Sequence, residues 1–70
     1  DVKESLIKEK DLELQVLEAY KEGKVSLEQG DVLYAARKFN EAEILYPQSD
    51  WASRSALMAA YSYYIQDYYI

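Results

Sequence analysis

The chain has 70 residues, contains no cysteine and no histidine, and carries a formal net charge of −5. The missing residue types exclude disulfide bridges, zinc sites built from thiolate or imidazole ligands, cysteine nucleophiles and histidine general bases. The acidic balance argues against nucleic acid as a partner, because phosphate backbones repel it. No apolar run approaches the ~18 residues of a membrane-spanning helix. With two glycines and one proline, the composition favours helices.

Residues 1–30 predict the first helix, which becomes regular from residue 12 onward. Its apolar and small positions fall on one helical stripe: Leu12, Val16, Ala19, Tyr20, Gly23 and Leu27. Residues 1–11 are less regular, so we expect a frayed or flexible lead-in there. Gly30 can end this helix because glycine accepts a positive φ, and Asp31 can cap the next helix.

The second helix is predicted over residues 32–46. Its stripe consists of Ala35, Phe39, Ala42 and Tyr46. Pro47 ends this helix, because the residue before a proline is pushed out of the α region.

The third helix is predicted over residues 51–66, with Ser49 or Asp50 as its cap. Its stripe is expected to consist of Ala52, Ala56, Ala59, Ala60 and Tyr63. Residues 66–70 are expected to form a turn and the start of a fourth helix, which would begin near Tyr68 and Tyr69.

The spacing of these elements is typical of tetratricopeptide repeats. Turns of this length make consecutive helices antiparallel neighbours, and the repeat has a period of ~34 residues with an Ala-x3-Phe mark followed by proline. The sequence carries this pattern at Gly23, Gly30, Ala35, Phe39, Ala42 and Pro47. It departs from the usual pattern at Ala19, Glu22, Ser26, Ala59 and Gln66.

We therefore predict an all-α fold of antiparallel helix–turn–helix, tetratricopeptide-like repeats. The chain would hold about one and a half repeats, as a fragment of a right-handed solenoid. Residues 1–16 would be the helical lead-in and residues 17–47 the first helix pair. Residues 48–70 would be the first helix and turn of a second repeat.

Two stretches carry a more specific resemblance. The first is "AARKFNEAEILYPQSDWA", with its Tyr-Pro and Ser-x-Trp-Ala junction, and the second is the tyrosine-rich "ALMAAYSYYIQDYY". With their surroundings, residues 17–70, they resemble the BamD (ComL-like) family of outer-membrane assembly lipoproteins.

The resemblance implies a scaffold on the periplasmic side of the outer membrane, attached through an N-terminal lipidated cysteine that these residues do not include. It implies protein partners, namely the periplasmic domains of the barrel-assembly subunit and unfolded outer-membrane proteins. It would also make this chain an N-terminal piece of such a protein.

The polar residues do not predict an enzyme, a metal site or a cofactor. Carboxylates pair in sequence at Glu9 with Glu13, Glu18 with Glu22, and Glu41 near Glu43. Lysines are interleaved with them and histidine is missing, so we interpret these pairs as solvated faces. The serines near Trp51, Ser49, Ser53 and Ser55, have no base partner and are expected to be cap and surface residues.

The candidate binding residues follow from the repeat geometry, in which the first helix of each repeat lines a concave surface. These residues are Tyr20, Lys24 and Leu27 from the first repeat, and Ala56, Ala60, Tyr63 and Tyr64 from the next. An equally weighted alternative is that Tyr63 and Tyr64 only pack between repeats.

Two other functions stay open at this point. The chain could belong to another periplasmic repeat protein, such as the cell-division coordinator that accompanies the Tol-Pal system. It could also be a small helical element that self-associates through its exposed tyrosine face and binds no ligand.

Overall fold

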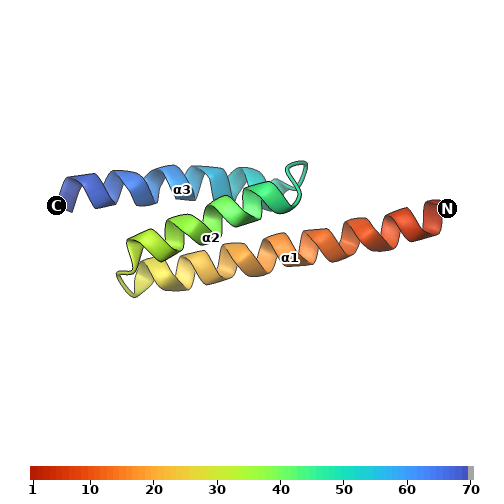
Figure 1. The fold of residues 1–70 in the computed structure, drawn as a ribbon, viewed down its shortest axis with the longest axis horizontal. Helices are drawn as coiled ribbons and strands as arrows, with labels where there is room; N and C mark the ends of the chain where they lie inside the picture. Colours follow the sequence, from red (N-terminus) through yellow and green to blue (C-terminus); the bar gives the residue numbers. More distant parts are fainter. Residues whose placement is uncertain (70) are drawn as a thin grey trace.

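The computed structural model describes the backbone of residues 1–69 and the side-chain surroundings of residues 1–67. The described residues form three helices and no strand: α1 (Val2–Glu28), α2 (Val32–Leu45) and α3 (Asp50–Tyr69). Consecutive helices run antiparallel, and α2 packs against both α1 and α3 (Figure 1). The N-terminal half of α1 and the C-terminal end of α3 project in opposite directions, so the molecule measures 51 × 17 × 13 Å. The predicted all-α helix–turn–helix fold is confirmed, whereas its continuation into a solenoid stays a prediction.

The turn between α1 and α2 forms as its sequence predicts. Gly30 has a φ of +87°, and its backbone N–H donates to the carbonyl of Leu27. The N–H of Asp31 donates to the carbonyl of Ser26, which closes the helix end. The Asp31 carboxylate then accepts from the N–H of Tyr34 at 3.2 Å and caps α2.

The turn between α2 and α3 also follows local chemistry. Tyr46, the residue before Pro47, is extended, with φ −156° and ψ 86°, as the proline requires. Ser49 is the cap of α3, because its Oγ accepts from the N–H of Trp51 at 3.1 Å. The Ser49 carbonyl also accepts from the N–H of Ala52.

The close approach of α1 to α2 depends on Gly23 and Phe39. A Cβ atom added at Gly23 would lie 2.6 Å from Cε1 of the Phe39 ring, closer than real atoms come. Phe39 is fully buried. The predicted roles of both residues, a gap on α1 and a ring that fills it, are therefore confirmed.

The core consists of two clusters along the helices. Around Phe39, Ala35 and Ala59 are buried, and Tyr20, Leu27 and Met58 cover them. Toward the α2–α3 turn, the second cluster holds Val16, Ala19, Ala42 and Ala52, covered by Leu45, Tyr46 and Trp51. Small alanines from all three helices let the backbones approach, so one large ring and one valine fill most of the interior.

The expected frayed lead-in is instead regular helix. α1 begins at Val2, and the Asp1 carboxylate caps it by accepting from the N–H of Lys3. Every side chain from Val2 to Asp11 is exposed. These residues lack an apolar stripe because no other helix covers them, although they are themselves helical.

The expected turn at residues 66–67 is wrong, because α3 continues through them to Tyr69. Neither Gln66 nor Asp67 supplies the positive φ or the missing N–H that ends a helix. Tyr68 and Tyr69, where a fourth helix was expected to begin, belong to α3 instead, and only Ile70 lies outside the described backbone. As far as Tyr69, none of the helices is long and apolar enough to cross a membrane.

The stripe predicted for α3 is partly wrong. Ala52 and Ala59 are buried, but Ala60 and Tyr63 are exposed and Ala56 is half-buried. As far as Asp67, the other buried positions of α3 are serines, Ser55 and Ser62.

Burial of these serines has a local cause. Ser55 Oγ donates to the carbonyl of Trp51 at 2.7 Å, and Ser62 Oγ donates to the carbonyl of Met58 at 2.8 Å. Each hydroxyl is satisfied within its own helix and can be buried like an alanine. Ser55 is therefore a core residue, not the surface residue that the sequence suggested.

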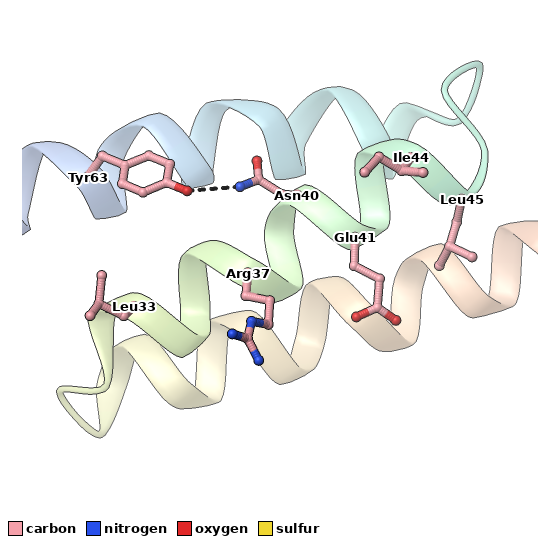
Figure 2. Close-up of a pocket in the computed structure, with 7 residues that line it drawn as sticks. All are labelled: Leu33, Arg37, Asn40, Glu41, Ile44, Leu45 and Tyr63. Atoms are coloured by element: carbon pink, nitrogen blue, oxygen red, sulfur yellow. Dashed lines mark hydrogen bonds between the residues drawn. The ribbon is translucent and has the colours of Figure 1, made fainter.

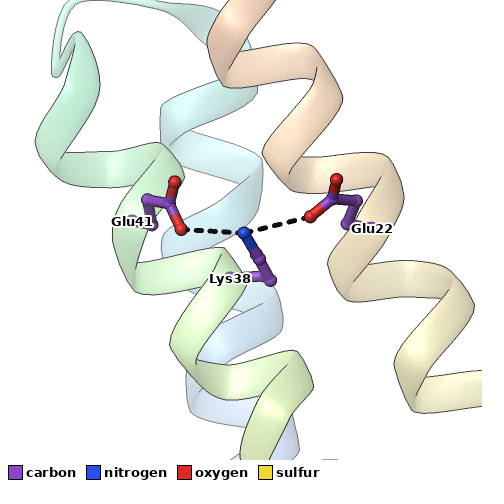
Figure 3. A network of polar contacts seen from close by, with 3 residues as sticks. All are labelled: Glu22, Lys38 and Glu41. Atoms are coloured by element: carbon purple, nitrogen blue, oxygen red, sulfur yellow. Dashed lines mark hydrogen bonds and ion pairs between the residues drawn. The ribbon is translucent and has the colours of Figure 1, made fainter.

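One polar cluster joins α1 to α2. Lys38 Nζ lies 3.0 Å from Glu22 Oε2 and 3.2 Å from Glu41 Oε2 (Figure 3). The side chain of Lys38 is only 20 % exposed. The hydrogen bond to Glu22, and then that to Glu41, raise the pKa of Lys38 above its usual range.

The Gly23–Phe39 contact gives a first prediction. Gly23→Ala should lower the free energy of unfolding by about 1–3 kcal/mol, because the added methyl group overpacks the Phe39 ring. In an open helix position the same change would stabilise by about 0.5–1 kcal/mol. Urea denaturation followed by circular dichroism measures the difference. Adding Phe39→Leu should recover part of the loss, and purely additive effects would contradict the contact.

The Lys38 cluster gives a second prediction. Lys38→Met should lower the free energy of unfolding by about 0.5–1 kcal/mol at low salt, whereas Lys21→Met, on an exposed lysine with no ion pair among the described side chains, should not. Folding raises the pKa of Lys38, so the protonated side chain contributes to the free energy of unfolding. This contribution is complete at pH values below the unfolded-state pKa of ~10.4, and it is lost as the pH rises through the higher folded-state pKa. Denaturation in molar salt should reduce the difference, and a salt-independent loss would contradict an ionic cause.

Candidate protein-binding site

A row of aromatic and cationic side chains crosses from α1 to α3. The rings of Tyr20 and Trp51 lie 5.0 Å apart between centroids, tilted by 49°. Lys24 Nζ lies 5.9 Å from the centre of the Tyr20 ring, and the Arg54 guanidinium lies 4.8 Å from that of Trp51. Both rings are half-buried and both cations are exposed. The row therefore presents aromatic surface between two positive charges.

The row is supported from below by the core. The Tyr20 ring also packs against Phe39, with 5.8 Å between the ring centroids. Leu27 and Met58 cover the same buried cluster from α1 and from α3. Since the floor under the row is packed, its aromatic rings lose little further freedom when a partner covers them.

The position of Trp51 is fixed by a bond between distant parts of the chain. Ser49 Oγ donates to Glu13 Oε2 of α1 at 2.8 Å while it accepts from the N–H of Trp51. Ser49 is buried. The first turn of α3 is thereby tied to the middle of α1, directly beside the row.

Tyr63 lies elsewhere, on the flank of α3 that faces α2. Its hydroxyl accepts from Asn40 Nδ2 at 3.0 Å (Figure 2). Together with residues of α2 it lines an open groove, whose lining is Leu33, Arg37, Asn40, Glu41, Ile44, Leu45 and Tyr63. Tyr63 is 48 % exposed, so it contributes to a surface here and not to the interior.

The predicted site residues thus fall into separate places. Tyr20, Lys24 and Leu27 gather where α1 meets α3. Ala56 is half-buried, and Ala60 and Tyr64 are exposed on α3. Ala56, Ala60 and Tyr64 follow one another four positions apart, on a different flank of α3 from Trp51 and Arg54.

Three α3 residues were not among the predicted site residues: Trp51 and Arg54 of the row, and Met58 beneath it. A signal for them was present. They are three and four residues apart, as neighbours on one helix face are. The predicted stripe of α3 followed its alanines, because serine was taken for a surface residue. The stripe was therefore placed on a flank of α3 away from Trp51 and Arg54.

The site offers no metal-binding geometry. Across the residues that the structure describes, no three acidic side chains gather where they could hold a metal ion.

Comparison with known proteins gives a family but no individual relative. The family model described as "YfiO: Outer membrane lipoprotein" matches residues 12–70. No curated protein and no solved structure matches the chain. The match covers most of the sequence and extends the resemblance to the BamD-like lipoproteins back from residue 17 to residue 12. The chain therefore belongs to the YfiO family of outer-membrane lipoproteins.

Proposed function

We propose that this chain is a non-enzymatic scaffold that binds other proteins on the periplasmic side of the outer membrane. It would act there in the machinery that assembles β-barrel proteins. Family membership supports the location, and it favours this function over that of a Tol-Pal-associated repeat protein. The observation that carries the binding role is the row formed by Lys24, Tyr20, Trp51 and Arg54.

The composition of the row suits a protein interface. Aromatic side chains and arginine often supply most of the binding energy in protein–protein contacts, because aromatic rings bury large areas and the arginine guanidinium offers several hydrogen-bond donors. Two cations stand at its ends although the chain carries a net charge of −5. A partner segment with apolar and acidic side chains would complement both features.

The partners we propose are those of the barrel-assembly machinery. The periplasmic domains of its barrel subunit come first, and segments of unfolded outer-membrane proteins come second. Ala56, Ala60 and Tyr64 would belong to a separate contact on the other flank of α3, next to Tyr63 at the α2 groove.

Charge reversal in the row gives a third prediction. Lys24→Glu and Arg54→Glu should each weaken binding to the purified periplasmic domains of the barrel subunit about fivefold, with helicity unchanged because both side chains are exposed. Isothermal titration calorimetry measures the affinity. Lys8→Glu, an equal charge change on an exposed lysine of α1 outside the row, is the control.

Tyr63→Ala separates the two surfaces. If it weakens binding while the Lys24 and Arg54 variants do not, the partner occupies the α2–α3 groove and the proposed site is wrong. If it unfolds the chain, Tyr63 is a packing residue.

Self-association is a second candidate property, and exposed apolar side chains on α3 favour it. Leu57 and Tyr61 lie four residues apart and are both largely exposed. Neighbours at this spacing form one continuous patch.

This patch gives a fourth prediction. The protein should associate in sedimentation velocity as its concentration rises, because a second copy would cover the exposed side chains. Leu57→Glu combined with Tyr61→Glu should leave it monomeric. A wild-type protein that stays monomeric at high concentration would contradict this property and leave the binding proposal intact.

A further inference from the structure

The side of α3 that faces away from the other two helices carries a continuous apolar surface. α3 lies at one edge of the three helices (Figure 1). Leu57, Tyr61 and Tyr64 are 72 %, 51 % and 63 % exposed, and Ala60 between them is exposed as well. At 3.6 residues per turn, these positions lie opposite the buried residues of α3. We call this surface, made of Ser53, Leu57, Ala60, Tyr61 and Tyr64, the α3 outer face.

The α3 outer face has the spacing of a contact between helices. Ser53, Leu57, Ala60 and Tyr64 follow one another at steps of four, three and four residues. This alternation is the pattern by which two helices pack lengthwise. The alanine in the middle leaves room for the axis of a second helix to come close.

The same face is symmetric about its middle. Leu57 and Tyr64 each stand three and a half residues from the midpoint between Ala60 and Tyr61. A two-fold axis through this midpoint, perpendicular to α3, sets Leu57 of each copy on Tyr64 of the other. It also sets Ala60 beside Ala60. Such mutual contacts are what an isologous dimer requires.

The charges favour an antiparallel pair of identical helices. No aspartate, glutamate, lysine or arginine occurs in residues 55–66. The nearest charges are Arg54 at one end and Asp67 at the other, and the two-fold axis brings Arg54 of one copy level with Asp67 of the second. A parallel pair would bring each charge level with its own copy, like beside like.

The exposed area suits a weak dimer. Leu57, Tyr61 and Tyr64 together expose about 400 Å² in each copy. With the side chains around them, two copies would bury about 1,000 Å², the size at which specific contacts begin. The net charge of −5 opposes this contact only weakly at physiological salt, because salt screens charges beyond ~8 Å.

We propose that the α3 outer face binds the same face of a second copy, as an antiparallel pair with two-fold symmetry. This inference rests on the self-association proposed above and specifies its geometry. Because the axis is perpendicular to α3, the flank that carries Trp51 turns to the same side in both copies, so the pair presents two rows to a partner. The pair covers Ala60 and Tyr64, so a partner bound at those residues competes with the second copy.

Engineered cysteines test the geometry, because the chain contains none of its own. Ala60→Cys should give a disulfide-linked dimer on mild oxidation, since the two residues meet at the axis. Ser53→Cys and Asp67→Cys should each stay unlinked, because each residue lies about 20 Å from its own copy, beyond the ~7 Å of a disulfide. An equimolar mixture of these two variants should cross-link, since residues 53 and 67 meet across the pair. Non-reducing gel electrophoresis measures all four.

A matched pair of substitutions measures what the face contributes. Leu57→Glu should weaken the dimerisation constant about a hundredfold in sedimentation equilibrium, because each dimer loses two buried leucines. Ile44→Glu makes the same kind of change on α2, at a side chain that is 78 % exposed, and should leave the constant unchanged. Added salt should strengthen the dimer, because it screens the net charge.

The possible failures differ from one another. A protein that stays monomeric at high concentration would remove both the self-association and this geometry. Association with cross-linking through Ser53→Cys alone would leave the self-association standing and overturn the antiparallel pair. Equal weakening by Leu57→Glu and Ile44→Glu would place the contact elsewhere. A monomer that binds phosphatidylcholine vesicles, and loses them on Leu57→Glu, would make the face a lipid surface.

Discussion

The contact between Gly23 and the ring of Phe39 sets the geometry of the whole chain. No side chain larger than hydrogen fits at residue 23 without displacing the ring, so the distance between α1 and α2 is fixed there. Phe39 in turn packs against Ala59 of α3 and the ring of Tyr20. The row that we propose as a binding surface thus stands on the same ring that holds the helices together.

Local chemistry explains why the helices and their turns could be predicted. Gly30, Asp31 and Ser49 act on backbone groups within a few residues of themselves, so the sequence contains all the information that places these turns. The Gly23 and Phe39 pair was predictable for another reason, since the repeat pattern already encodes the contact between two helices.

The face of α3 was not predictable in the same way. Ser55 and Ser62 are buried because each hydroxyl is satisfied within its own helix, and this choice depends on which neighbours approach. The bond between Glu22 and Lys38 likewise joins two helices whose rotation must be known first. The same error affected the candidate site, because the rotation of α3 about its own axis decides which of its residues lie beside Tyr20.

The bond between Ser49 and Glu13 has a consequence for rigidity. It joins residues 36 positions apart, whereas the turn before α3 is only a few residues long. If α3 swung about that turn as a hinge, the buried hydroxyl would lose its carboxylate partner. The bond therefore holds the Trp51 end of α3 against α1, so the three helices cannot open at this turn without breaking it.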